Sequence, residues 1–363
     1  MNPVIREFKT IGAEIRPALP GLYVAVAVAI AARFLHDLIP NPSMARAVSE
    51  VFIAVLLGLH VRNAIQLSGR FEPGIRFALQ RILRLGIILL GLRLSLQDVI
   101  STGLASLLLI LACLAFALGL AYLFGRLLRI PRRLAALIGV GTAICGNSAI
   151  IATAPVIEAK DEDVSYAVAT ITFFGTLAVL IYPAIGFFIG MTDRAFGLWA
   201  GTAILDTSQV VAAGVAFSDA ARDVATVVKL VRNTLMAPLI LAIGLVYANA
   251  QRTRDTSYRM TPGNLVPWFV LAFVGMTIVR TVLNQFGFLP LDVNNPNDMV
   301  FGANLLRAAD EVAKFAILVA LSAIGLSTDV AAVRRTGPKP LLLGFAVAGA
   351  LAVFSLVLVT LFY

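Results

Sequence analysis

Two short polar segments interrupt apolar stretches of this sequence, and both carry residues whose backbone and hydroxyl groups can donate hydrogen bonds to an anion. These residues are Thr142, Cys145, Gly146, Asn147 and Ser148 in the first segment, and Asp206, Thr207 and Ser208 in the second. Asn147 or Ser148 can cap a new helix over residues 149–157, and Asp206, Thr207 or Ser208 can cap one over residues 209–217. The free amides and the positive dipole end at a helix start favour an anion. We therefore expect two helix starts to form an anion site; the alternative is two ordinary kinks capped by their own side chains.

A later apolar stretch carries two cations, Lys229 and Arg232. Their i, i+3 spacing puts both on one helical face. Arg232 lies about 13 Å inward from Asp223 at a rise of 1.5 Å per residue. An arginine at that depth costs about 2.5–3.5 kcal/mol on insertion scales, so it normally faces a cavity or a partner. We expect the two cations to attract the anion; the alternative is a buried ion pair with Asp206.

Asp206 also suggests how transport could be coupled to protons. An ionised carboxylate would neutralise one of the two cations, and protonation of that carboxylate would release the cation for a substrate. The rival interpretation is a cation/proton antiporter in which Asp206 is the ion-binding carboxylate.

The composition requires these residues to lie in a membrane protein. Of the 363 residues, 60% are hydrophobic and only 13% are charged, and the mean hydropathy is +0.92. Soluble domains are about one quarter charged. The net charge of +9 does not point to nucleic acid, because the arginines cluster in short gaps between apolar stretches, as in cytoplasmic loops. The alternate gaps hold little beyond Arg46, Lys160 and Arg222, which places the N-terminus in the cytoplasm and the C-terminus in the periplasm.

The apolar stretches predict an all-α, polytopic protein with one integral membrane domain over residues 1–363. Uninterrupted candidate spans cover residues 19–39, 47–62, 78–96, 103–126, 164–190, 223–248, 265–286, 305–327 and 340–363. With the interrupted segments 134–158 and 195–218, they give about eleven membrane elements. The rise per residue puts both interruptions near the bilayer midplane. Charge counting does not decide whether these two segments are broken spans or re-entrant hairpins.

The two interrupted segments also resemble each other. Gly141-Thr142-Ala143-Ile144 matches Gly201-Thr202-Ala203-Ile204 at an offset of 60 residues. A weaker resemblance links residues 85–99 with 315–330, which would cross the membrane in opposite directions, as in an inverted repeat. The alternative is chance recurrence of small residues in tightly packed membrane helices.

The stretch from Gly139 to Ile150, the pair Lys229-x-x-Arg232 and the helix end Ala323–Leu326 resemble the bacterial inner-membrane family of proposed sulfate exporters. The resemblance covers nearly the whole chain, and its Ile-Cys-Gly-Asn-Ser stretch is distinctive. It implies a secondary transporter, related to antiporters with inverted repeats and broken helices. No residue roles are transferred from the family.

Together these observations predict an inner-membrane secondary transporter for a small anion such as sulfate or an organosulfonate, with protons as a coupling partner. We expect a homodimer in the lipid bilayer, by analogy with other transporters. No enzyme activity, cofactor, metal or nucleic-acid partner is expected. An intramembrane enzyme would have to use Cys145, with no histidine in the same span, and a scaffolding protein would have no accessible cavity.

Overall fold

The computed structural model describes residues 3–39, 49–65, 67–251, 268–286 and 301–363, and the regular elements within these ranges are all helices. The predicted all-α class is therefore confirmed. The helices are α1 (Pro3–Asp37), α3 (Glu50–Ile65), η1 (Gly69–Phe71), α4 (Glu72–Phe77), η2 (Ala78–Ile82), α5 (Leu83–Leu90), α6 (Leu96–Leu127), α7 (Arg132–Ala143), α8 (Asn147–Thr153), α9 (Asp161–Phe188), α10 (Asp193–Ala203), α11 (Thr207–Phe217), α12 (Asp219–Thr234), α13 (Met236–Gln251), α14 (Trp268–Gln285), α15 (Phe301–Ser327), α16 (Val330–Arg335) and α17 (Pro338–Phe362).

Six helical regions of the described chain are long and apolar enough to cross a membrane. They are Arg16–Asp37, Leu96–Leu127, Asp161–Phe188, Asp219–Gly244, Trp268–Gln285 and Pro338–Phe362. This confirms a polytopic membrane protein. The larger number of about eleven membrane elements stays a prediction.

The chain forms two compact units, Met1–Arg93 with Val279–Val330 and Leu94–Ile278 with Ala331–Tyr363. In the first unit, α3 crosses α15 where Gly58 meets Gly325. A Cβ atom built on Gly325 would lie only 2.9 Å from the Gly58 Cα atom. Small residues thus let the two backbones approach closely, as is common between membrane helices. The prediction of a single membrane domain stays a prediction.

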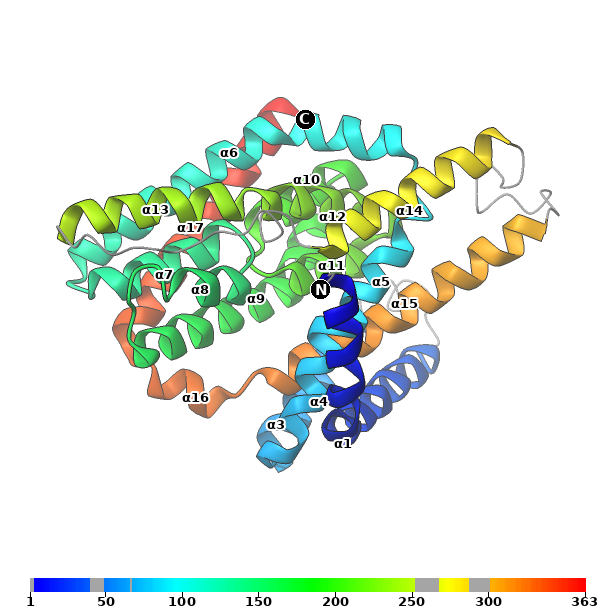
Figure 1. Ribbon diagram of the computed structural model, residues 1–363, viewed down its shortest axis with the longest axis horizontal. Helices are drawn as coiled ribbons and strands as arrows, with labels where there is room; N and C mark the ends of the chain where they lie inside the picture. Colours follow the sequence, from blue (N-terminus) through cyan, green and yellow to red (C-terminus); the bar gives the residue numbers. More distant parts are fainter. Residues whose placement is uncertain (1–2, 40–48, 66, 252–267, 287–300) are drawn as a thin grey trace. The chain divides into compact units, whose positions relative to one another are not determined.

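In the second unit, α6, α9, α12 and α17 pack around two interrupted helix pairs, α7–α8 and α10–α11 (Figure 1). The first pair is interrupted at residues 144–146 and the second at residues 204–206. The first interruption lies inside the polar stretch Thr142–Ser148, whereas the second shares only Asp206 with the polar stretch Asp206–Ser208 and begins two residues earlier.

Each interrupted pair turns back on itself. Arg133 at the start of α7 forms an ion pair with Glu158, beyond the end of α8, at 3.4 Å. Asp193 at the start of α10 accepts a hydrogen bond from the Ser218 hydroxyl, just beyond α11, at 2.7 Å. A chain continuing straight through an interruption would separate such residues by about 37 Å. Each interrupted segment is therefore a helical hairpin, and its re-entrant course in the membrane stays a prediction.

The hairpins enter the second unit from opposite ends. Helix α9 starts at Asp161, beside the base of the first hairpin, and ends at Phe188, five residues before the base of the second. Its 28 residues span about 42 Å. Lys160, two residues after Glu158, therefore lies toward the same end of the unit as Arg133, and the side of the membrane that each faces stays a prediction.

The same offset of 60 residues relates the two hairpins throughout. It takes Arg133 to Asp193 and Glu158 to Ser218, the residues that close the two bases. This match supports an internal duplication with inverted halves, although the repeat itself stays a prediction.

Candidate functional site

The tips of the two hairpins touch at Gly146 and Asp206. Gly146 has a backbone φ of +64°, which residues with a side chain rarely adopt. A Cβ atom built there would lie 2.9 Å from Asp206 Oδ2 and 3.1 Å from its Cβ atom. Glycine is therefore required both by the sharp turn and by the close approach of the second hairpin.

Lys229, on α12, connects the two tips. Its side chain is completely buried. Its Nζ atom donates hydrogen bonds to the carbonyl oxygens of Ile144 at 2.7 Å, Ile204 at 3.0 Å and Leu205 at 2.6 Å. Three acceptors around one nitrogen require three N–H groups, so the geometry fits a protonated ammonium.

Arg232 lies one turn further along α12 and also binds both hairpins. Its guanidinium donates to carbonyl oxygens of α7 and of the chain around the end of α10: Thr142, Ala143 (2.6 Å), Gly201 (3.3 Å), Thr202 (2.8 Å) and Ile204 (3.1 Å). Helix C-termini leave carbonyl groups without internal partners and carry the negative end of the helix dipole. The two cations thus stabilise two helix C-termini, and their donor groups point at backbone oxygens.

Asp206 is engaged within its own hairpin. Its Oδ1 atom accepts hydrogen bonds from the Ser208 amide at 3.0 Å and the Ser208 hydroxyl at 2.7 Å. The side chain of Gln209 accepts from the Asp206 amide at 3.1 Å, which completes a capping box. Within the described residues, Lys229 and Arg232 bind backbone carbonyl oxygens and no ion pair joins either of them to Asp206. The alternative of a direct buried ion pair is therefore wrong, and α11 is capped by its own side chain.

Two amide–hydroxyl pairs attach the tips to the neighbouring spans. Asn147 Nδ2 donates to Thr172 Oγ1 of α9 at 3.0 Å, and Asn233 Nδ2 of α12 donates to Thr207 Oγ1 at 3.1 Å. In both pairs the remaining amide oxygen is buried and lacks a hydrogen-bond partner among the described residues. Rotating an amide by 180° exchanges its oxygen and nitrogen, because the two ends have nearly the same shape. Each pair therefore leaves one buried polar amide atom without a hydrogen bond among the described residues.

Thr172 touches both hairpins. Its hydroxyl accepts from Asn147, and its backbone carbonyl accepts from Gln209 Nε2 at 3.4 Å. Thr172, Gln209 and Asn233 are absent from the residues predicted from sequence. Asn233 could have been predicted as a site residue, because it directly follows Arg232 in the sequence. Thr172 lies in an apolar span, where nothing in the sequence marks it as a site residue.

The predicted residues differ in their access to a ligand. Ser148 is exposed, whereas Asn147, Asp206 and Thr207 are half-buried. Thr142, Cys145, Gly146 and Ser208 are buried. The Cys145 thiol lies 3.5 Å from the sulfur of Met236, in apolar packing.

The two helix starts are not equivalent. The first was expected to run over residues 149–157, but α8 has only seven residues and ends at Thr153. Asn147 and Ser148 form no side-chain cap, because Gly146 holds the N-cap position. Helix α11 has 11 residues, close to the expected 209–217. The stronger helix dipole therefore lies at α11, beside the buried Asn233.

A second group of polar side chains lies in the first unit. Ligand atoms of His36, Asp37 and Glu50 lie within 4.8 Å of one another, where α1 ends and α3 begins. Asp37 is exposed, and surface carboxylates gather in this way without a metal. We therefore assign no metal to this group.

Comparison with known proteins identifies the family. A family model described as "Conserved hypothetical protein 698" matches residues 20–344. A UPF0324 membrane protein of Clostridium tetani is 33% identical over 348 residues, which cover 92% of this chain and 94% of the relative. UPF0324 membrane proteins of Streptococcus agalactiae (35% over 333 residues, 90% and 92% of the two chains) and Fusobacterium nucleatum (34% over 308 residues, 83% and 88%) are also similar. The chain therefore belongs to the UPF0324 family of membrane proteins, and the family resemblance seen in its sequence is confirmed.

Proposed function

We propose that this protein is a secondary transporter that binds a small anion where the two hairpin tips meet. The observation that carries the proposal is the pair of buried cations, Lys229 and Arg232, which bind the backbone of both hairpin tips close to Asp206. The proposed setting is the inner membrane, with a cytoplasmic N-terminus, a periplasmic C-terminus and a homodimeric assembly.

The charges at the tips favour an anion. Lys229 and Arg232 supply two positive charges, and the C-termini of α7 and α10 offset about one of them, at about half a charge each. Ionised Asp206 offsets the other, while the N-terminus of α11 adds about half a positive charge. The balance is slightly positive, and protonation of Asp206 would raise it by one unit. Anion binding would thus be strongest when Asp206 carries a proton, which supports proton coupling.

The polar groups next to Asp206 fit an oxyanion. With their amides rotated, Asn147 and Asn233 would present N–H donors to a ligand while still accepting from Thr172 and Thr207. Sulfate and sulfonate oxygens only accept hydrogen bonds, so they match such donors. In this arrangement Lys229 and Arg232 would not contact the anion. They would hold the two tips together and contribute positive charge near the site.

The topology supports transport. Two hairpins that enter from opposite ends bring helix termini to one place in the interior of the unit, as in transporters whose substrate sites lie between inverted repeats. Such a site can open to either side of the membrane in turn. An ion gradient or the gradient of the substrate itself would drive the movement.

Uptake of labelled sulfate and of labelled organosulfonates into proteoliposomes tests the proposal. Asn147→Asp and Asn233→Asp should each lower anion uptake about 10- to 100-fold, because a hydrogen bond to a charged ligand is replaced by charge repulsion. Gln97→Glu, the same change on an exposed residue at the start of α6, should leave uptake unchanged.

The same variants distinguish the rival function. A cation/proton antiporter with Asp206 as its ion ligand would gain or keep cation exchange when a further carboxylate is added at Asn147 or Asn233. Cation-driven proton movement that survives in both variants, without anion uptake in the wild type, would reject the anion proposal.

A further inference from the structure

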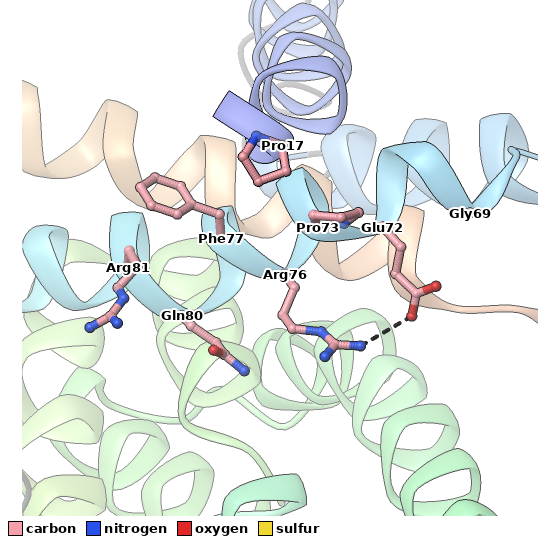
Figure 2. A pocket seen from close by; sticks show the side chains of 8 residues that line it. All are labelled: Pro17, Gly69, Glu72, Pro73, Arg76, Phe77, Gln80 and Arg81. Atoms are coloured by element: carbon pink, nitrogen blue, oxygen red, sulfur yellow. Dashed lines mark hydrogen bonds and ion pairs between the residues drawn. The ribbon is translucent and has the colours of Figure 1, made fainter. Parts of the chain in front are cut away.

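An open hollow of about 400 Å³ lies in the first unit, between α1 and the helical run from η1 to η2. Figure 2 shows Pro73 and Phe77 extending from one side of this run, and Arg76 and Gln80 from another. The apolar and the polar side chains therefore do not face one common ligand, and we assign no ligand to the hollow. The groups that join both hairpin tips lie in the second unit, along α9.

Two neighbouring helices, α12 and α9, bind the hairpins. The two cations of α12 bind the arms that enter, because Lys229 and Arg232 donate to carbonyl oxygens around the ends of α7 and α10. Thr172 of α9 binds the arms that return. Its hydroxyl accepts from Asn147 at the start of α8, and its carbonyl accepts from Gln209 near the start of α11. One residue of α9 thus joins the two returning arms.

Gln209 is buried more deeply than a helix cap requires. Its Oε1 atom accepts from the Asp206 amide at 3.1 Å, and this bond alone fulfils its part in the capping box. The side chain is nevertheless only 3% exposed. Burial of the remaining amide nitrogen is costly unless it donates a hydrogen bond, and its acceptor is the Thr172 carbonyl at 3.4 Å. Gln209 therefore connects the start of α11 to α9.

A glycine on α9 makes room for this side chain. Gly175 lies about one turn after Thr172, and a Cβ atom built on it would overlap Gln209 Oε1 and lie 2.6 Å from Gln209 Nε2. The overlapping atoms are the end of a side chain and not backbone. Alanine at residue 175 would therefore displace the Gln209 amide while the backbones of α9 and α11 stay in place.

The first hairpin has no such connection. The offset of 60 residues places Ala149 at the position equivalent to Gln209, and Leu235 at the position equivalent to Gly175. A hairpin tip can thus be built without a buried amide against the next helix. This difference favours a role for Gln209 in the site over a general role in forming the hairpin.

We propose that Gln209 is a positioning residue of the anion site. Through Thr172 it fixes the start of α11, where Asp206 lies, relative to Asn147 at the tip of the first hairpin. Both polar atoms of its amide are used in this connection, so Gln209 would not contact the anion. This inference rests on the proposed function, because it assigns to Gln209 the geometry between the proton-binding carboxylate and a donor to the anion.

The KM and the maximal rate of labelled sulfate uptake into proteoliposomes test the proposal. Gln209→Ala and Gly175→Ala should each raise the KM about 2- to 10-fold, the range expected for one lost hydrogen bond, and should change the maximal rate less. Gly119→Ala adds the same methyl group to an exposed glycine of α6 that meets open space. It is the matched control and should leave the KM unchanged.

The Gly175→Ala/Gln209→Ala double variant tests whether the two residues act through one contact. Its KM should be no higher than that of either single variant, because the added methyl group enters the space that the glutamine leaves. Two independent effects would multiply, and that result would overturn the connection. Thermal unfolding of the purified variants shows whether each is folded, and the double variant should be more stable than Gln209→Ala.

A purely structural role gives a different result. If Gln209 only caps α11, Gln209→Ala lowers thermal stability and both single variants keep the KM of the wild type, which would overturn the positioning role in a protein that transports. A wild-type protein that takes up no sulfate or organosulfonate would instead reject the proposed function, and the present inference with it.

Discussion

The guanidinium of Arg133 lies 3.4 Å from the carboxylate of Glu158, although 25 residues and a complete helix interruption separate them. The hydrogen bond between Ser218 and Asp193 closes the other hairpin at the equivalent positions. Each hairpin thus returns to the end from which it entered. Because α9 crosses between the two bases, the tips approach each other from opposite ends of the unit.

This topology predicts the accessibility of introduced cysteines. Arg132→Cys and Lys160→Cys should react with a membrane-impermeant thiol reagent from one side, and Met191→Cys and Asp219→Cys from the other. The assay compares labelling of intact cells with labelling of inverted membrane vesicles.

Background labelling should be low, because Cys113 and Cys145 are 1% and 5% exposed. Labelling of Lys160→Cys from the side opposite to Arg132→Cys would show that the first interrupted segment crosses the membrane and would refute the hairpin.

Lys229 should be essential for stability as well as for transport. Lys229→Met leaves the carbonyl oxygens of Ile144 and Leu205 without this donor, whereas that of Ile204 keeps Arg232, and an unsatisfied buried acceptor costs about 1–3 kcal/mol. The free energy of unfolding of the purified protein measures this loss. Lys339→Met, on the exposed start of α17, should change stability by less than about 0.5 kcal/mol. A Lys229→Met protein of normal stability that no longer transports would instead make Lys229 a substrate ligand.

Gly146 should tolerate alanine less well than Gly190, although both have positive φ, at +64° and +66°. At Gly190 a Cβ atom would meet nothing within 4 Å, so Gly190→Ala should cost only the backbone strain, about 1–2 kcal/mol. At Gly146 the same strain is joined by a clash with Asp206, and the contact between the tips must open. We expect Gly146→Ala to lower both thermal stability and anion uptake, and equal effects of the two substitutions would contradict the tip contact.

Asp206 should determine whether transport responds to pH. Asn is as good a helix N-cap as Asp, so Asp206→Asn should preserve the start of α11. The asparagine side chain is uncharged, like a permanently protonated Asp206. We therefore expect anion uptake to continue in this variant but to lose its stimulation by a pH gradient. Measurements of proteoliposome uptake with and without the gradient check this. Stimulation that persists in the variant would place proton coupling elsewhere.

Alanine should have opposite effects at two helical glycines, Gly325 at the crossing of α3 and α15 and Gly349 on an open face of α17. Gly349→Ala should stabilise α17 by up to about 1 kcal/mol, because it meets open space and alanine favours helix. Gly325→Ala should destabilise the first unit by about 1–3 kcal/mol, because its Cβ atom would lie 2.6 Å from the Leu59 amide nitrogen. Thermal unfolding of the two variants measures both changes, and stabilisation by Gly325→Ala would refute the close crossing.

The amino-acid sequence by itself determined that the chain is a helical membrane protein and where its two helices are interrupted. Composition and the local chemistry of Gly146 and Asp206 suffice for this, because lipid exposure and helix capping depend on neighbours in the sequence. The spacing of Lys229 and Arg232 likewise placed both cations on one buried face.

Only the tertiary structure decided what those groups do. The acceptors of Lys229 lie up to 85 residues away, so the sequence did not reveal that the cations bind the C-termini of α7 and α10 instead of Asp206. The choice between hairpin and span depended on Arg133 meeting Glu158, and the contribution of Thr172 depended on α9 passing both tips. In each case the deciding interaction joins residues that are distant in sequence and that only the folded chain brings within hydrogen-bonding distance.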